Sequence, residues 1–262
     1  MSKHFTKSFA PIPWNASPID FAQAAADVPH MGIYTVETTQ RFIPGTRHLT
    51  WDGRIYKYSL STGTVGQGRL ANHTGSVATY GVAYTTVATS KVVGDQQVRI
   101  ASQSFAKDVL AGGMVLLYGA DYTYYQQRGI MGNNYCSSAQ LDIDLEAPLA
   151  TAITAASTGI EVQPNPYRYV GPYNNESSHA GVPATRATSG YYFWLQTWGM
   201  CNVEPGESMT GAYNRQLVGG MGAGACYLHT TANAITYQSQ HIGFILDAGT
   251  AVVPFVMLQI SI

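Results

Sequence analysis

The sequence predicts an all-β protein, built from one or two β-sandwich or barrel modules with an extended N-terminal arm and one short helix. Three observations predict this class. Short apolar or alternating segments recur along the chain, Gly, Pro and Asn turns separate them, and helical periodicity is almost absent after Pro29. With 262 residues, 45% of them hydrophobic, the chain is long enough for one large or two medium domains.

The N-terminal segment predicts an arm. Residues 1–16 are polar and basic and are interrupted by Pro11 and Pro13, so they cannot build a core of their own. We expect this arm to lie against a neighbouring subunit. Its apolar anchors would be Phe5, Phe9 and Trp14.

One short helix is expected after the arm, over residues 18–27. Ser17 is a suitable cap, Pro18 suits the first helical position, and Asp20 lies in the first turn. The Ala-rich stretch that follows stops before Pro29.

Strands are expected along the rest of the chain, because β-branched and aromatic residues dominate its apolar segments. The Asp52-Gly53 pair between apolar flanks predicts a tight hairpin turn over residues 51–54. The expected strands cover residues 32–36, 55–58, 82–87, 98–100, 114–118, 141–145, 191–198 (ending at Gly199), 241–246 and 252–260.

These elements suggest three regions. We expect an N-terminal arm with its helix over residues 1–40, a β domain over 41–180 and a C-terminal β domain over 181–262. The turn-rich stretch 164–190 is expected to be a long loop or a linker between β modules.

The composition points to a protein whose surface is covered by partners. Only 11% of the residues are charged, against about 25% in an ordinary globular chain, and the chain holds 18 Tyr and 27 Gly. Interface cores are depleted in charge and enriched in Tyr. The formal net charge of −1 argues against a general nucleic-acid binder.

Charge is unevenly distributed along the chain. Residues 1–107 hold ten Lys or Arg against five Asp or Glu, whereas residues 108–262 hold four against ten. Two halves of opposite charge suit head-to-tail contacts between copies, or an N-terminal half that docks on an acidic surface. Compositional drift between two domains explains the same pattern equally well.

The candidate chemical motifs are weak. Asp142, Asp144 and Glu146 share one strand face, as a Ca²⁺ site or an acid–base pair could, although a solvated face is the simpler interpretation. The seven His form no zinc motif, and the three Cys are expected to be small buried hydrophobes. We therefore expect no catalytic residue, no metal, no cofactor and no enzymatic activity.

Glycine-rich and aromatic runs each have two interpretations. The run over residues 63–68 is glycine-rich, but no Lys-Ser/Thr pair follows it, so a loop is favoured over a phosphate site. The aromatic runs at 122–125 and 191–194 could be sugar-stacking platforms, or they could divide between core and interface.

Signals for secretion and membrane insertion are not evident in the sequence. Residues 1–10 lack an apolar core, and no run approaches the roughly 18 apolar residues that span a bilayer. We expect a cytosolic protein without a membrane partner.

The C-terminal third carries a family resemblance. Residues 190–199, Gly-Tyr-Tyr-Phe-Trp-Leu-Gln-Thr-Trp-Gly, precede a turn-rich stretch, Gln-His-Ile-Gly-Phe at 240–244 and an apolar terminal strand at 252–260. Together with Trp-Asp-Gly-Arg-Ile-Tyr-Lys-Tyr at 51–58, and with weaker similarity at 145–149 and 164–167, this pattern resembles head decoration (cement) and other capsid-associated structural proteins of tailed bacteriophages.

The resemblance implies a non-enzymatic virion protein that binds the exterior of the capsid. Its partners would be the major capsid protein and further copies of itself, as a homotrimer. The expected interface residues outside the arm are Trp51, Arg54, Tyr191, Trp194 and Trp198. A carbohydrate- or receptor-binding β-sandwich of a fibre or tail is the rival interpretation, and a glycan hydrolase is a third.

Overall fold

The structure is a computed structural model that describes residues 32–75, 77–119, 125–172, 178–209, 215–220, 224–229, 240–247 and 253–260. This part of the chain is nearly all β, which confirms the predicted fold class. The expected arm and the helix over 18–27 lie outside the described residues, and so do Phe5, Phe9 and Trp14.

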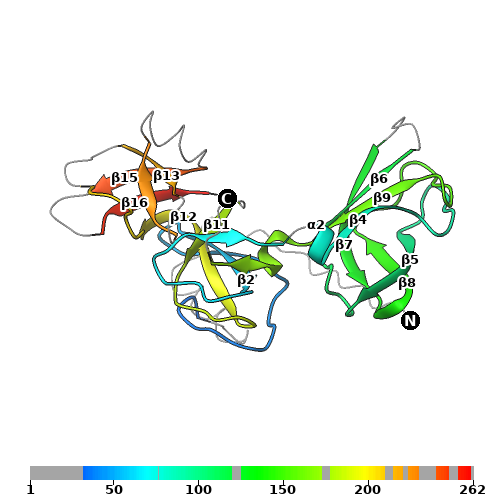
Figure 1. The fold of residues 1–262 in the computed structure, drawn as a ribbon, viewed down its shortest axis with the longest axis horizontal. Coiled ribbons are helices and arrows are strands. Elements are labelled where there is room, and N and C mark those ends of the chain that lie inside the picture. The colour runs from blue at the N-terminus through cyan, green and yellow to red at the C-terminus, as the bar shows by residue number, and fades with distance from the viewer. Residues whose placement is uncertain are drawn as a thin grey trace. The chain divides into compact units, whose positions relative to one another are not determined.

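Ten strands form an antiparallel sheet (Figure 1). The main path runs β10-β3-β11-β12-β16-β15-β13-β14, and β2 joins it by pairing with β12 and with β1. The strands are β1 (Arg47–Leu49), β2 (Ile55–Leu60), β3 (Ala71–His73), β10 (Val170–Gly171), β11 (His179–Pro183), β12 (Tyr192–Asn202), β13 (Gln216–Gly219), β14 (Cys226–Leu228), β15 (His241–Asp247) and β16 (Phe255–Gln259).

Six further strands form a second antiparallel sheet in the order β4-β9-β6-β7-β8-β5. An isolated bridge between Val87 and Ile100 links the end of β4 to β5, so this sheet is nearly closed into a barrel. The strands are β4 (Val82–Thr86), β5 (Gln97–Phe105), β6 (Met114–Tyr118), β7 (Tyr125–Asn133), β8 (Cys136–Leu145) and β9 (Gly159–Gln163).

Strand β8 shows how the sequence forms this barrel. Leu141, Ile143 and Leu145 point inward and are at most 4% exposed, whereas Asp142 and Asp144 alternate with them on the outer face. The inward residues join a core of aliphatic side chains from the other five strands. The alternation of apolar and polar residues therefore agrees with the strand predicted over residues 141–145.

The two sheets do not divide the chain at the expected boundary. Strands β4 to β9 lie within residues 82–163, and the ten-stranded sheet takes strands from both sides of this segment. Residue 180 falls inside β11, so the ranges 41–180 and 181–262 do not separate the sheets. The reason is that the chain leaves the larger sheet after β3 and returns to it at β10, which local sequence patterns do not reveal.

Short helical segments flank the barrel strands. The helical turn α2 (Val77–Tyr80) precedes β4, and the 3-10 turn η1 (Pro166–Arg168) follows β9. The rings of Tyr80 and Tyr169 stack at 3.9 Å between centroids, with 19° between their planes, and so join the two connecting segments.

Two of the expected strands differ in the structure. Residues 32–36 form no strand, because their only pairing nearby is a bridge between Glu37 and Tyr192. Strand β12 continues through Gly199 to Asn202, because Gly199 adopts a φ of +93° and lets the chain bend while it pairs with β16.

The buried His179 links β11 to β3, and the half-buried His73 links β3 to the η1 turn. Nδ1 of His179 lies 2.8 Å from Oδ1 of Asn72, and Nδ1 of His73 lies 2.9 Å from the carbonyl oxygen of Pro166. Burial lowers the pKa of His179 to about 4, and burial also lowers the pKa of His73. Both rings are therefore neutral at pH 7.

Acidification should destabilise the protein through His179. Because its pKa is depressed in the folded state, the unfolded chain binds the proton more readily, and stability falls as the pH drops from about 6.5 towards 4. A pKa change of this size removes about 2 kcal/mol between pH 7 and pH 5. Urea unfolding at both pH values should show this loss, and His179→Gln should reduce it. An equal loss in both proteins would contradict the assignment.

Candidate functional site

The β1–β2 hairpin carries the candidate site. The backbone N–H of Thr50 donates to the carbonyl of Arg54 at 2.9 Å, and the N–H of Gly53 donates to the carbonyl of Thr50 at 3.0 Å. Gly53 adopts a φ of +83°, which a glycine accepts without strain. The Asp52-Gly53 pair therefore forms the predicted tight turn.

Side chains fix the conformation of this turn. Asp52 accepts hydrogen bonds from the hydroxyl of Thr50 and from Nε of Arg54, the latter at 2.7 Å. Nη1 of Arg54 donates to the hydroxyl of Tyr56 at 2.9 Å and to that of Tyr34 at 3.4 Å. The bond from Thr50 lowers the pKa of Asp52, and the bond to Tyr34 raises the pKa of Arg54, so both stay charged.

Trp51 projects from this fixed turn into solvent. Its side chain is 94% exposed, and Leu49 in the same hairpin is 56% exposed. A fully exposed tryptophan on an ordered turn is unusual, because it leaves a large apolar surface in contact with water. Burying this side chain in an interface would gain favourable hydrophobic free energy. We call the exposed face formed by Leu49, Trp51 and Arg54 the hairpin surface.

A groove of about 290 Å³ adjoins the hairpin surface through Arg54. Its exposed apolar walls are formed by Tyr34, Met200 and Phe255, which lie in three segments far apart in the chain. It is lined by Tyr34, Arg54, Tyr56, Gln67, Gly68, Val182, Pro183, Ala184, Gln196, Met200, Cys201, Asn202 and Phe255.

The titratable groups of the groove are suited to contact with a partner rather than to proton transfer. Burial raises the pKa of Tyr56 to about 12 and that of the Cys201 thiol to about 12. Both groups are therefore neutral at pH 7, while Arg54 is cationic. The groove offers aromatic and thioether surface, amide groups and one guanidinium, a mixture typical of protein interfaces.

Gly199 on β12 makes room for Arg54. A Cβ at this position would lie 2.9 Å from Cγ and 3.1 Å from Cα of Arg54, and the backbone there has a φ of +93°. The hairpin therefore packs against β12 at Gly199, and any larger residue at this position would displace Arg54.

The structure places the expected interface residues in different environments. Trp51 and Arg54 lie together on the hairpin surface, whereas Tyr191 and Trp198 are half-buried. The expectation for Trp194 is wrong: its side chain is 3% exposed, and its ring lies 5.3 Å from that of Tyr58, centroid to centroid. It packs in an aromatic cluster within the chain, where no partner reaches it.

The sequence does not indicate which residues form the walls of the groove. Tyr34, Met200 and Phe255 lie far apart in the chain and carry no shared local pattern. The one available signal was the Asp-Gly turn, which placed Arg54 at the start of a return strand.

A second exposed aromatic feature lies on the barrel. The rings of Tyr84 and Tyr118 stack at 5.6 Å, and those of Tyr118 and Tyr125 lie 6.3 Å apart. Tyr84 and Tyr125 are each 62% exposed, while Tyr118 lies against Gly159 and donates to Oε1 of Glu161 at 3.3 Å. We call Tyr84, Tyr118 and Tyr125 the tyrosine row.

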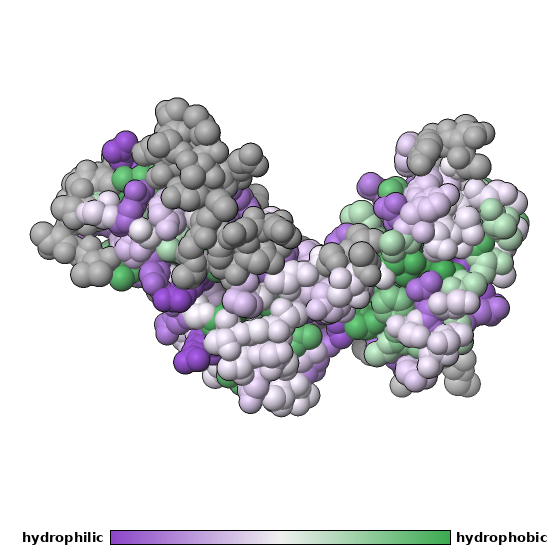
Figure 2. Space-filling view, in the orientation of Figure 1, coloured by the Kyte–Doolittle hydropathy of each residue, from purple (hydrophilic) through white to green (hydrophobic). Residues whose placement is uncertain are grey.

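Apolar side chains other than tyrosine also reach the surface of the barrel module. Val92 is 67% exposed and Val93 61%, and Met131 is 59% exposed. Figure 2 shows apolar surface over this part of the molecule. The charge-poor composition thus corresponds to exposed aromatic and aliphatic surface.

The carboxylates on β8 and directly after it are engaged by different neighbours. Arg99 holds Asp142 through two hydrogen bonds of 2.5 and 2.9 Å, and Nε2 of Gln97 donates to Asp144 at 3.0 Å. Glu146 accepts from the backbone N–H of Gly129 at 2.9 Å. Within the residues that the structure describes, no group of three or more His, Cys, Asp or Glu side chains is placed to hold a metal ion.

Comparisons with known protein families, with curated protein sequences and with solved structures give no match to this chain. In the described part of the chain, no helix has the length and apolar character needed to cross a membrane.

Substituting Gly199 should cost more stability than substituting Gly53. Gly199→Ala adds both backbone strain and a clash with Arg54, about 2 kcal/mol in all. Gly53→Ala, with no atom within 4 Å of the added Cβ, should cost only the strain, about 1 kcal/mol. Urea unfolding of the two variants measures both costs. Equal costs would show that Arg54 is not held against Gly199.

Proposed function

We propose that this chain is a structural protein of a tailed-bacteriophage virion that binds the outer surface of the capsid and stabilises the head. One observation carries the proposal: Trp51 is 94% exposed on a turn that four hydrogen bonds among neighbouring side chains hold in one conformation. Such an anchor reaches a partner surface without further ordering of the loop, which lowers the entropic cost of binding.

The surroundings of Trp51 support a protein partner. Exposed Leu49, Met200 and Phe255 supply apolar contact area, and Arg54 supplies a cation at its margin. Tryptophan and arginine are the residues most enriched among those that dominate protein interfaces. The partner in this proposal is the major capsid protein, bound at the capsid exterior by a homotrimer of this chain after assembly in the host cytoplasm.

Replacing Trp51 should weaken capsid binding without weakening the fold. We expect Trp51→Ala to lower affinity for purified expanded capsids at least tenfold in a co-sedimentation assay, since hot-spot residues contribute about 2 kcal/mol or more. Its Tm should be unchanged, because the side chain contacts little within the chain.

Tyr135→Ala is the matched control, since this aromatic is 69% exposed on the barrel. It should bind capsids like the wild type. The proposal fails if Trp51→Ala binds capsids undiminished, or if the wild-type protein does not bind them at all.

The tyrosine row supports a second candidate function, a carbohydrate- or receptor-binding role in a fibre or tail. Exposed rings on a sheet offer apolar faces on which sugar rings stack, and Glu161 beside Tyr118 offers an acceptor for a sugar hydroxyl. The tyrosine row lies on the barrel, whereas the hairpin surface belongs to the ten-stranded sheet, so the two functions can be separated by substitution.

A glycan array tests this second function. If it holds, the wild-type protein binds a defined set of glycans, and the double variant Tyr84→Ala/Tyr125→Ala loses that binding. Trp51→Ala should retain it. An array without specific binding, or binding that survives the double variant, would contradict a lectin role for the tyrosine row.

A further inference from the structure

Strand β1 is an open edge of the ten-stranded sheet. It pairs with β2 on one side, and no described strand pairs with its other side. The backbone N–H of Tyr58 donates to the carbonyl of Thr46 at 2.9 Å. Because hydrogen-bonded pairs alternate along an antiparallel ladder, His48 is the next residue bonded to β2. Arg47 and Leu49 therefore direct their N–H and C=O groups away from β2.

The backbone of this edge is accessible. All three residues of β1 are exposed, and Leu49 is 56% exposed. The outward N–H and C=O groups of Arg47 and Leu49 make no hydrogen bond within the described part of the chain. Such groups are the template on which another chain can add a strand.

Two cationic side chains lie side by side at this edge. Arg47 is directly opposite Lys57 of β2, and like charges in this position destabilise a pair of strands. The ammonium group of Lys57 lies over the ring of Tyr167, 5.9 Å from its centroid. Burial, and then the charge of Arg47, lower the pKa of Lys57. Among the described residues, no carboxylate forms an ion pair with either cation.

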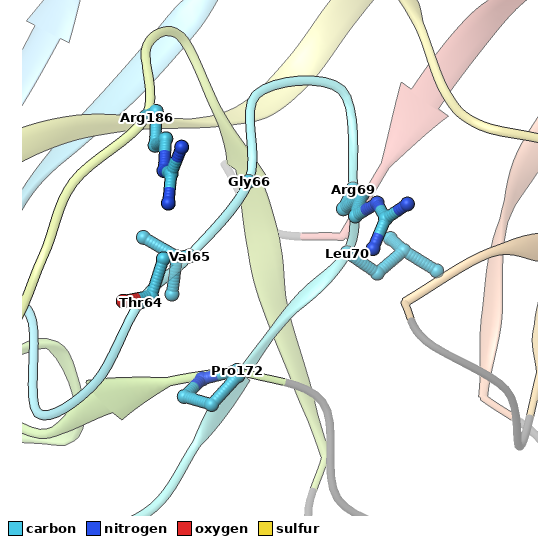
Figure 3. A pocket seen from close by; sticks show the side chains of 7 residues that line it. All are labelled: Thr64, Val65, Gly66, Arg69, Leu70, Pro172 and Arg186. Carbon is cyan, nitrogen blue, oxygen red and sulfur yellow. The ribbon is translucent and has the colours of Figure 1, made fainter.

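Arg69 shows how a cation elsewhere in the same sheet is compensated. It lines a cavity of about 400 Å³ (Figure 3), and its Nε and Nη2 donate to the carboxylate of Glu204 at 2.5 and 2.9 Å. The positive charge of Arg47 and Lys57 would instead be compensated by an anionic partner. A second copy of β1 would add a further Arg47, so like charges oppose pairing between copies.

We propose that β1 binds an extended acidic segment of another protein, which adds a strand to this edge of the sheet. The outward N–H and C=O groups of Arg47 and Leu49 form the main-chain hydrogen bonds. Because side chains alternate between the two faces of a strand, a carboxylate of the added strand lies beside Arg47 and Lys57. An apolar side chain two residues away packs on Leu49. The inference goes beyond the capsid role and is tested without capsids, so neither result decides the other.

Hydrogen exchange on the full chain tests whether the edge is open. Relative to its intrinsic rate, the amide of Leu49 should exchange at least tenfold faster than that of His48, which is bonded within the ladder. A protected Leu49 amide in the free protein would show that the chain itself covers the edge, and would overturn the proposal.

A capped peptide, Thr-Glu-Thr-Val-Thr-Glu-Thr, is the probe for binding, because its Glu and Val side chains share one face in either strand direction. It should shift the amide resonances of Arg47 and Leu49. It should also bind at least tenfold more tightly than Thr-Lys-Thr-Val-Thr-Lys-Thr at the same ionic strength. Equal affinities for the two peptides, or no shift of these amides, would overturn the proposal.

Variants separate strand addition from contact with side chains alone. Leu49→Pro removes an outward N–H and leaves the bonds to β2 in place, so it should weaken binding of the Glu peptide at least tenfold with little change in Tm. Leu49→Ala is the matched control, because it keeps that N–H and should lose less affinity. Equal losses in the two variants would contradict strand addition.

Arg47→Gln tests the role of charge. It should reduce the preference for the Glu peptide over the Lys peptide, and it should raise Tm at low salt because it removes the repulsion with Lys57. An unchanged preference would overturn the acidic character of the partner segment.

Discussion

The ten-stranded sheet depends on the burial of both faces of strand β12. This strand pairs with β2, β11 and β16, and its side chains from Tyr192 to Thr197 are all buried. Phe193 and Leu195 fill one face, while Trp194 packs among aromatic rings on the other. Each large side chain contributes about 1.5–3 kcal/mol by burial, and a slip by one residue would exchange the two faces. The register of the neighbouring strands is therefore fixed by β12.

The hairpin surface takes its geometry from that register. Strand β2 runs antiparallel to β12 from the pair Ile55 and Trp198 onwards, and Arg54 packs over Gly199 where β12 bends. The turn that follows β1 is thus anchored at its base by the sheet and at its tip by hydrogen bonds to Asp52. Trp51 is exposed on a rigid support, which is the arrangement that favours tight contact with a partner at low entropic cost.

Local features of this structure could be predicted from the sequence, and long-range ones could not. The Asp52-Gly53 turn and the alternation over residues 141–145 are confirmed, because each depends on neighbours a few residues away. The sequence did not reveal that residues 82–163 form a separate barrel between two parts of the larger sheet. Nor did it distinguish Trp51, which is in solvent, from Trp194, which is in the core, because burial depends on which distant segments pack over each side chain.

The most direct test of the account is an electron cryomicroscopy map of capsids carrying this protein. The account predicts density for the chain on the capsid exterior, with the tip of the β1–β2 hairpin buried against the major capsid protein and the side chain of Trp51 in that contact. A map in which the chain is absent from the exterior, or is bound with Trp51 facing solvent, would contradict it.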